Sequence, residues 1–315
     1  MSSYRKKSGS PLTYAFAIAT WLSAIPLLLF GGLVTSLDAG MSIDGWMVLD
    51  PGHGDHFLLF YPIEKWFRDM GTISEHSHRL FGVLVGNLAI ATWLLTCAKG
   101  THRRGRLVAF SALMAVCVQG LIGGTRVLEN SPQLAFLHGA LAQIVFAVLA
   151  GSAVYLSPRY RDSVEVSGAE SAQLRRGSLL ALTVTYTAIF GGAWLRHSFS
   201  HAALGVHILL ITLATVTIFR LAGMLKRYAG DDQSKKPLRS AARRLHMLVG
   251  MQLILGVASF WVVEMLPDAE GVDLHYSSYP TLHVLFGALI LAQLTSTALW
   301  TKRVCTAASE PQVTH

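Results

Sequence analysis

The chain has 315 residues, of which 52% are hydrophobic and 14% are charged, and its formal net charge is +8. Soluble domains carry roughly 25% charged residues, so this composition excludes an ordinary soluble domain. The positive charge lies in short segments between apolar runs, which argues against nucleic-acid binding. The three cysteines have neither the spacing of a metal site nor that of a disulfide framework. We therefore predict a polytopic, all-α membrane protein.

Eight apolar runs come close to the ~20 residues that cross a bilayer. The predicted membrane helices cover residues 12–36, 75–98, 106–127, 134–156, 178–196, 203–223, 243–266 and 280–301. The first run is long enough to stay as a membrane anchor, and no clear cleavage site follows it. An even number of spans places both termini on the same side of the membrane.

The basic residues indicate which side this is. The two tails and the loops between predicted helices 2 and 3, 4 and 5, and 6 and 7, together with the helix ends that flank them, hold 21 of the 26 Lys and Arg residues. The opposite side holds the other five and 12 of the 18 acidic residues. Positively charged loops stay in the cytoplasm, so both termini are predicted to be cytoplasmic, in a cell inner or plasma membrane.

The longest segment on the outer side covers residues 37–74. Its part from Phe57 to Met70 mixes aromatic and charged residues and could form an amphipathic helix on the membrane surface, beginning near Pro62. His53 and His56 could bind a metal, although the run has no further ligands at usable spacing. A loop of this length often serves as a lid.

The two halves of the chain repeat one another weakly but in the same order. The matched features are Phe30-Gly31-Gly32 with Phe190-Gly191-Gly192, the Gln119-to-Glu129 run with the Gln252-to-Glu264 run, and one histidine on each even-numbered helix. We therefore predict two tandem four-helix bundles. The first covers residues 1–156 with its outer loop, a cytoplasmic linker covers 157–177, and the second bundle covers 178–315.

Four histidines enter the membrane at equivalent depth, two in each half: His78, His138, His207 and His283. Two facing imidazoles in a four-helix bundle can supply both axial ligands of a haem, and glycines in the helices would leave room for a flat porphyrin. Zinc is the alternative metal, but two nitrogen ligands per half fall short of a tetrahedral set. The remaining histidines, His76 among them, are assigned to helix ends and loops, with His201 as an alternative to His207 for the ligand on its helix.

Glu75 precedes His78 by three residues, so the two side chains share one face of a helix. A carboxylate at the mouth of a membrane helix is costly and is by default a functional candidate. The alternative is a polar helix end in the headgroup layer.

The motif Glu75-His-Ser-His78-Arg79 resembles the Glu-x-x-His-Arg motif of the heme A synthase family, and eight helices in two repeats extend the resemblance to nearly the whole chain. The segment from Asp38 to Trp46 also resembles that family's first outer loop. The resemblance implies an oxidoreductase that converts a ring methyl of haem O to a formyl group, giving haem A for cytochrome oxidase. It implies membrane lipid, a haem O synthase and an electron donor as partners, and leaves open a homo-oligomer.

By the same resemblance, His78 and His138 bind the iron of haem O, while His207 and His283 bind that of a resident haem b. Glu75 is the implied catalytic carboxylate, and Arg79 is the implied partner of a haem propionate. Two features depart from the family. The outer loop lacks the cysteine pair of many members, and Ile208 follows His207 where the family tends to have Arg.

A membrane electron carrier with two haem b groups and no chemistry of its own is the rival interpretation. It explains four histidines equally well but gives Glu75 no task. A transporter is a less suitable interpretation. Transporter folds commonly have inverted repeats and broken helices, whereas the two repeats predicted here run the same way through the membrane.

Overall fold

The structure is a computed structural model that describes residues 10–162, 166–167, 171–198, 200–265 and 274–306. Within these residues, eight helices are long and apolar enough to cross a membrane, which confirms the predicted number of spans. They are α1 (Pro11–Ser36), α3 (Met70–Ala98), α4 (Arg103–Leu128), α5 (Pro132–Leu156), α7 (Ser171–Ser198), α8 (His201–Ala229), α9 (Lys236–Met265) and α10 (Leu274–Val304).

Polar side chains fix where several of these helices begin. Ser10, Asp69, Ser131 and Ser200 each accept a hydrogen bond from a backbone N–H in the first turn of the helix that follows. Such caps satisfy donors that would otherwise lack a partner. Asp69 and Thr72 cap each other reciprocally, so α3 starts at Met70, five residues before the predicted helix.

Other helices also extend beyond their predicted apolar spans. α7 begins at residue 171 rather than 178, α8 ends at 229 rather than 223, and α9 begins at 236 rather than 243. The added turns carry basic residues such as Arg175, Arg176 and Lys226, which are good helix formers but too polar to be counted in a hydropathy window. Part of the predicted linker 157–177 is therefore helix.

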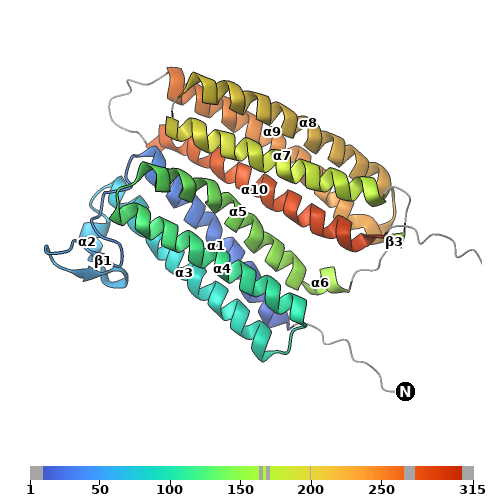
Figure 1. Cartoon of the computed structure of the whole chain (residues 1–315), viewed down its shortest axis with the longest axis horizontal. Coiled ribbons are helices and arrows are strands. Elements are labelled where there is room, and N and C mark those ends of the chain that lie inside the picture. The colour runs from blue at the N-terminus through green and yellow to red at the C-terminus, as the bar shows by residue number, and fades with distance from the viewer. Residues whose placement is uncertain (1–9, 163–165, 168–170, 199, 266–273, 307–315) are drawn as a thin grey trace, which may run out of the picture.

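The long helices form two groups of four (Figure 1). Helices α1, α3, α4 and α5 contact one another, as do α7, α8, α9 and α10. The groups meet where α10 packs against α1 and α5, and where α5 packs against α7. Small residues allow close approach at this seam, because a Cβ on Gly32 would come within 2.9 Å of the Thr281 side chain. The division into two independent domains stays a prediction.

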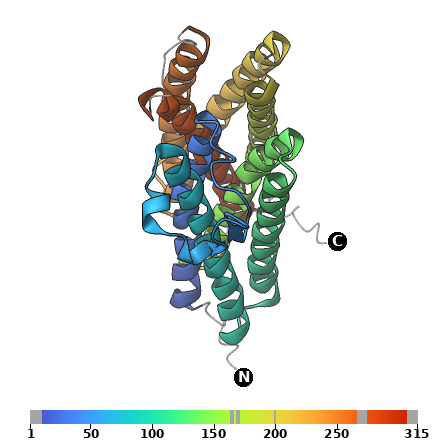
Figure 2. The same ribbon diagram turned by 90° about the vertical axis from the view of Figure 1, so that its left-hand side faces the viewer.

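The short elements lie at the two ends of the helices. At one end, β1 (Val48–Leu49) pairs antiparallel with β2 (His56–Phe57), followed by η1 (Leu58–Phe60) and α2 (Ile63–Trp66). We call residues 37–69 the cap, which projects beyond the helices in Figure 1 and faces the viewer in Figure 2. At the other end are α6 (Pro158–Arg161), η2 (Gln233–Lys235), and the parallel pair β3 (Val166–Ser167) and β4 (Cys305–Thr306).

The predicted amphipathic helix over Phe57–Met70 is wrong. Only one helical turn, α2, follows Pro62, and the chain then turns into α3. The hydroxyl of Thr72 donates to the Trp66 carbonyl, which holds this turn together. Apolar side chains are nevertheless exposed here, with Phe60 at 78% and Ile63 at 68%.

Candidate functional site

His78 on α3 and His138 on α5 face each other within the first helix group. Their ring centroids lie 6.2 Å apart, with the ring planes at 83°. Both residues lie in the first turns of their helices, toward the cap. The structure therefore brings together two of the four histidines that the sequence singled out.

The imidazole of His78 is held by α1. Its Nδ1 lies 2.9 Å from the Leu27 carbonyl oxygen. Since a carbonyl can only accept, Nδ1 carries the proton and Nε2 keeps its lone pair. The ring rests on Gly31, where an added Cβ would lie 2.8 Å from Cε1.

His207 repeats this arrangement in the second group. Its Nδ1 lies 3.0 Å from the Ala188 carbonyl oxygen, and its ring rests on Gly192, where a Cβ would lie 2.8 Å from Cε1. In both halves the carbonyl precedes the glycine by four residues. The repeat therefore matches Gly31 with Gly192, one residue away from the register that the Phe-Gly-Gly motifs indicate.

The histidines on α5 and α10 have glutamine partners. The Gln119 side-chain nitrogen lies 3.1 Å from His138 Nδ1 and donates to the His138 carbonyl at 2.8 Å. A Cβ on Gly123, one turn further along α4, would lie 2.7 Å from the His138 ring.

The second half shows the same spacing between a glutamine and a glycine. The Gln252 side-chain nitrogen lies 3.2 Å from His283 Nε2, and a Cβ on Gly256 would lie 3.0 Å from the His283 ring. Four glycines thus seat imidazole rings. This role depends on contacts between helices, so the sequence pattern alone did not indicate it. That helix glycines also leave room for a porphyrin stays a prediction.

The residues present fit a haem. A metal–nitrogen bond of roughly 2 Å on each side of an iron places two opposed imidazole centroids about 6 Å apart, as observed for His78 and His138. In His78 and His207, a proton held on Nδ1 by a backbone carbonyl leaves Nε2 free as a ligand, which is the usual support of metal-binding histidines. His283 also has a buried Nδ1 without a hydrogen-bond partner.

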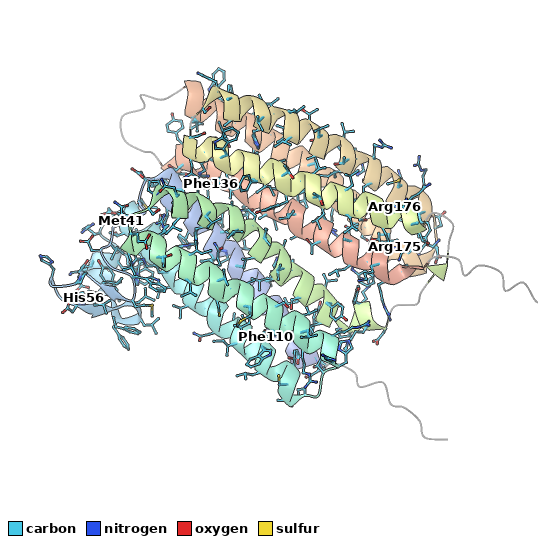
Figure 3. All side chains as sticks on the ribbon, viewed as in Figure 1. Met41, His56, Phe110, Phe136, Arg175 and Arg176 are labelled. Atoms are coloured by element: carbon cyan, nitrogen blue, oxygen red, sulfur yellow. The ribbon has the colours of Figure 1, made fainter. Side chains whose placement is uncertain are left out.

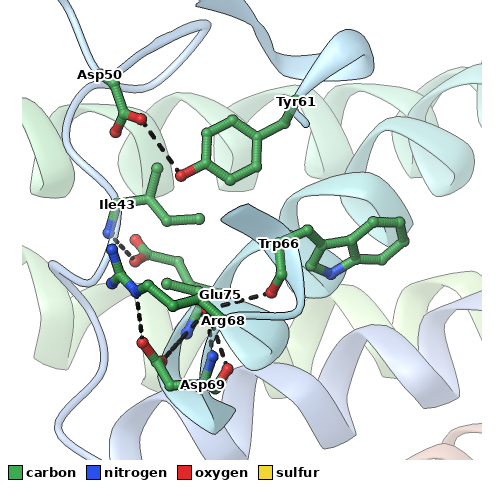
Figure 4. Close-up of polar contacts among 8 residues, drawn as sticks. Ile43, Asp50, Tyr61, Trp66, Arg68, Asp69 and Glu75 are labelled. Carbon is green, nitrogen blue, oxygen red and sulfur yellow. Dashed lines mark hydrogen bonds and ion pairs between the residues drawn. The ribbon is translucent and has the colours of Figure 1, made fainter. Parts of the chain in front are cut away.

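Glu75 is buried, at 2% exposure, and connects α3 to the cap. One carboxylate oxygen accepts the Ile43 backbone N–H at 2.9 Å (Figure 4), and the other lies 2.6 Å from Arg79 Nη2. The ion pair is nearly inaccessible on both sides. Glu75 is therefore enclosed by the protein rather than exposed at a helix end.

Arginines hold the cap over this site. Arg79 donates to the carbonyl oxygens of Ile43 and Gly45, and Arg126 donates to that of Gly40. The guanidinium of Arg79 is thus engaged by Glu75 and the cap, whereas the sequence analysis assigned it to a haem propionate. That assignment stays a prediction.

His76 is wrongly assigned to an exposed helix end. It is buried, at 2% exposure, between the rings of Tyr61 and Trp66, whose centroids each lie 5.0 Å from its own. The Tyr61 hydroxyl donates to Asp50, 3.4 Å away (Figure 4). Burial has the larger effect and the nearby Asp50 carboxylate the next largest, and both raise the pKa of the Tyr61 hydroxyl. The raised pKa favours the protonated hydroxyl, which donates this hydrogen bond.

Asp69 anchors the junction of cap and α3. The backbone N–H of Thr72, and then Arg68, lower the pKa of its carboxyl group. A lowered pKa means that the carboxylate contributes stability above its unfolded-state pKa and loses it as the pH falls.

His53 and His56 join no cluster of three metal-ligating side chains among the residues the structure describes. His56 instead packs edge-on against Tyr61.

Comparison with known proteins finds similarity over part of the chain. The family model COX15-CtaA, described as cytochrome oxidase assembly protein, matches residues 62–206. This match covers slightly less than half of the chain. The matched segment contains Glu75, His78, Arg79 and His138, but it ends just before His207 and does not reach His283.

Curated relatives named heme A synthase share part of the chain. One from Rhizobium rhizogenes is 32% identical over 44% of this chain and 38% of its own length. One from Paramagnetospirillum magneticum is 30% identical over 42% of this chain and 40% of its own length. One from Roseobacter denitrificans is 28% identical over 39% of this chain and 32% of its own length. The matches thus span less than half of the relatives' length.

Proposed function

We propose that this protein is a heme A synthase, a membrane oxidoreductase that converts a ring methyl of haem O to a formyl group. The opposed His78–His138 pair with the buried Glu75 one turn away is the observation that carries the proposal. All three residues lie in the segment matched by the family, and the matched relatives are named heme A synthase. The product, haem A, serves cytochrome oxidase.

The residues have distinct roles in this proposal. His78 and His138 bind the iron of the substrate haem O and fix the register of its ring. Converting a methyl to a formyl group adds one oxygen atom and removes four electrons from the substrate. With water as the oxygen source, four protons leave and an electron acceptor takes up the four electrons. With two molecules of dioxygen as the source, an electron donor supplies four electrons, four protons are consumed and three molecules of water are released. Glu75, buried one turn outward of His78, accepts protons or stabilises positive charge at the carbon that is oxidised.

The second histidine pair would hold a resident haem b, at His207 and His283. Such a group supplies one-electron transfer when bound. Carbonyl and glutamine contacts that repeat those of the first pair support this assignment. The electron donor and a haem O synthase are further proposed partners.

The activity is tested by pigment analysis. When the full chain is produced in cells that make haem O but lack their own heme A synthase, we expect haem A to appear. The His138→Ala variant should yield haem O and no haem A. The electron-carrier alternative predicts no haem A from either protein, and that result would reject the proposed function.

We also propose an orientation for this multi-pass membrane protein, with both chain ends cytoplasmic and the cap outside. Arg175 and Arg176 lie at the end of the molecule opposite Met41 and His56 (Figure 3), in keeping with positively charged cytoplasmic ends. A reporter fused after Cys305 should report cytoplasm, and one inserted near Gly54 should report the outside. The reverse pattern would contradict this orientation.

A further inference from the structure

Arg196 is a cation without a matching anion. It lies near the end of α7, where its Nη2 donates to the Gly32 carbonyl at 3.0 Å and to the Ser36 hydroxyl at 2.7 Å. Both acceptors are uncharged. Among the described carboxylates, none forms an ion pair with this guanidinium. A partly buried charge normally requires a partner.

The position of Arg196 relates it to the second histidine pair. It follows Gly192, the seat of the His207 ring, by four residues, so it lies one helical turn further toward the cap end on the same face. A flat ligand held by the imidazole would reach this level with its outer edge. These two hydrogen bonds of Arg196 use only Nη2, which leaves the other N–H groups of the guanidinium to donate to a ligand.

The first half offers a comparison. Arg126 follows Gly123, the seat of the His138 ring, by three residues, so it too lies about one turn outward of an imidazole. Arg79 lies beside that site as well, but Glu75 neutralises its charge. Each half thus has an arginine one turn beyond a glycine that seats a histidine.

We propose that Arg196 binds a carboxylate of the ligand held by His207 and His283, namely a propionate of the resident haem. This inference rests on the proposed function, which places a haem at that pair. The planar guanidinium of Arg196 suits bidentate recognition of a carboxylate.

The test is the midpoint potential of the resident haem in the purified full chain, compared between wild type and Arg196→Gln. A nearby cation favours the reduced haem, which carries one positive charge fewer. Removing the cation should lower the ratio of reduced to oxidised haem at a fixed potential about tenfold, which is 59 mV for one electron. The haem should also be lost more readily to an external acceptor protein.

Two further variants separate the effect of the Arg196 charge from the effect of its hydrogen bonds. Arg196→Lys keeps the cation and should retain most of the wild-type potential. Ser36→Ala removes a hydrogen bond of Arg196 without changing any charge, and should leave the potential unchanged. An unchanged potential and unchanged haem retention in Arg196→Gln would overturn this inference alone. Absence of haem from His207 and His283 in the wild type would overturn it together with that part of the proposed function.

Discussion

Replacing Glu75 by Gln is expected to lower haem A formation about a hundredfold or more, because the loss of a group that transfers protons typically costs that much. The variant should accumulate haem O or a partly oxidised alcohol while it retains haem b. Gln can still accept the Ile43 N–H, so the cap keeps one of its two contacts to this position. Pigments extracted from cells with each variant provide the measurement.

The structure adds a second consequence, since Glu75 also neutralises Arg79. Removing one partner of a buried ion pair typically costs about 3–5 kcal/mol, because the other charge is left uncompensated. We therefore expect faster proteolysis of the cap in Glu75→Gln. Glu75→Asp keeps the charge and should retain partial activity. Glu64→Gln changes an exposed cap carboxylate and serves as the control for both readouts.

If Glu75→Gln forms haem A at the wild-type rate, the carboxylate has no catalytic role, whatever happens to the cap. If the cap opens and haem O no longer binds, Glu75 acts as a positioning residue. Binding of haem O, followed by optical spectroscopy of the purified variant, separates these two outcomes from a defect in oxidation.

The number of spans could be predicted from the sequence because about twenty apolar residues have few alternatives to a membrane helix. The ends of the helices could not be predicted in this way. The turns around Arg175 and Lys226 are helical because their residues are good helix formers, but they lie beyond the apolar stretch that a hydropathy window detects. The cap was misjudged for a related reason. An amphipathic pattern over Phe57–Met70 suggested one helix, but the reciprocal cap of Asp69 and Thr72 starts a new helix at Met70.

The candidate site, too, could be predicted only in part from the sequence. The four histidines could be found because a repeat in sequence places them on equivalent helices. Their supports could not, because a carbonyl on α1 or a glutamine on α4 becomes a partner only when helices pack. His76 illustrates the point, since neither Tyr61 nor Trp66 neighbours it in sequence, and together they bury it.

The glycines that seat the imidazoles lead to a prediction specific to each half. A Leu at Gly123 would place its Cβ 2.7 Å from the His138 ring, so the ring must shift. Displacing a metal ligand or its support typically costs about 10–100-fold in metal affinity, so Gly123→Leu should lose haem O and retain haem b. Gly120→Leu is the matched control on α4, because nothing lies within 4 Å of a Cβ there.

The second half provides the reciprocal experiment. Gly256→Leu should displace His283 and deplete haem b by about tenfold or more. Its control on α9 is Gly250→Leu, which should keep both pigments because a Cβ at residue 250 meets nothing within 4 Å. All four variants add the same side chain to a membrane helix, so general effects on insertion appear equally in controls. Loss of both pigments from both test variants would indicate one shared site, and normal pigments in both would show that these histidines do not bind haem. Selective loss, of haem O from one variant and haem b from the other, is the outcome that two separate histidine pairs require.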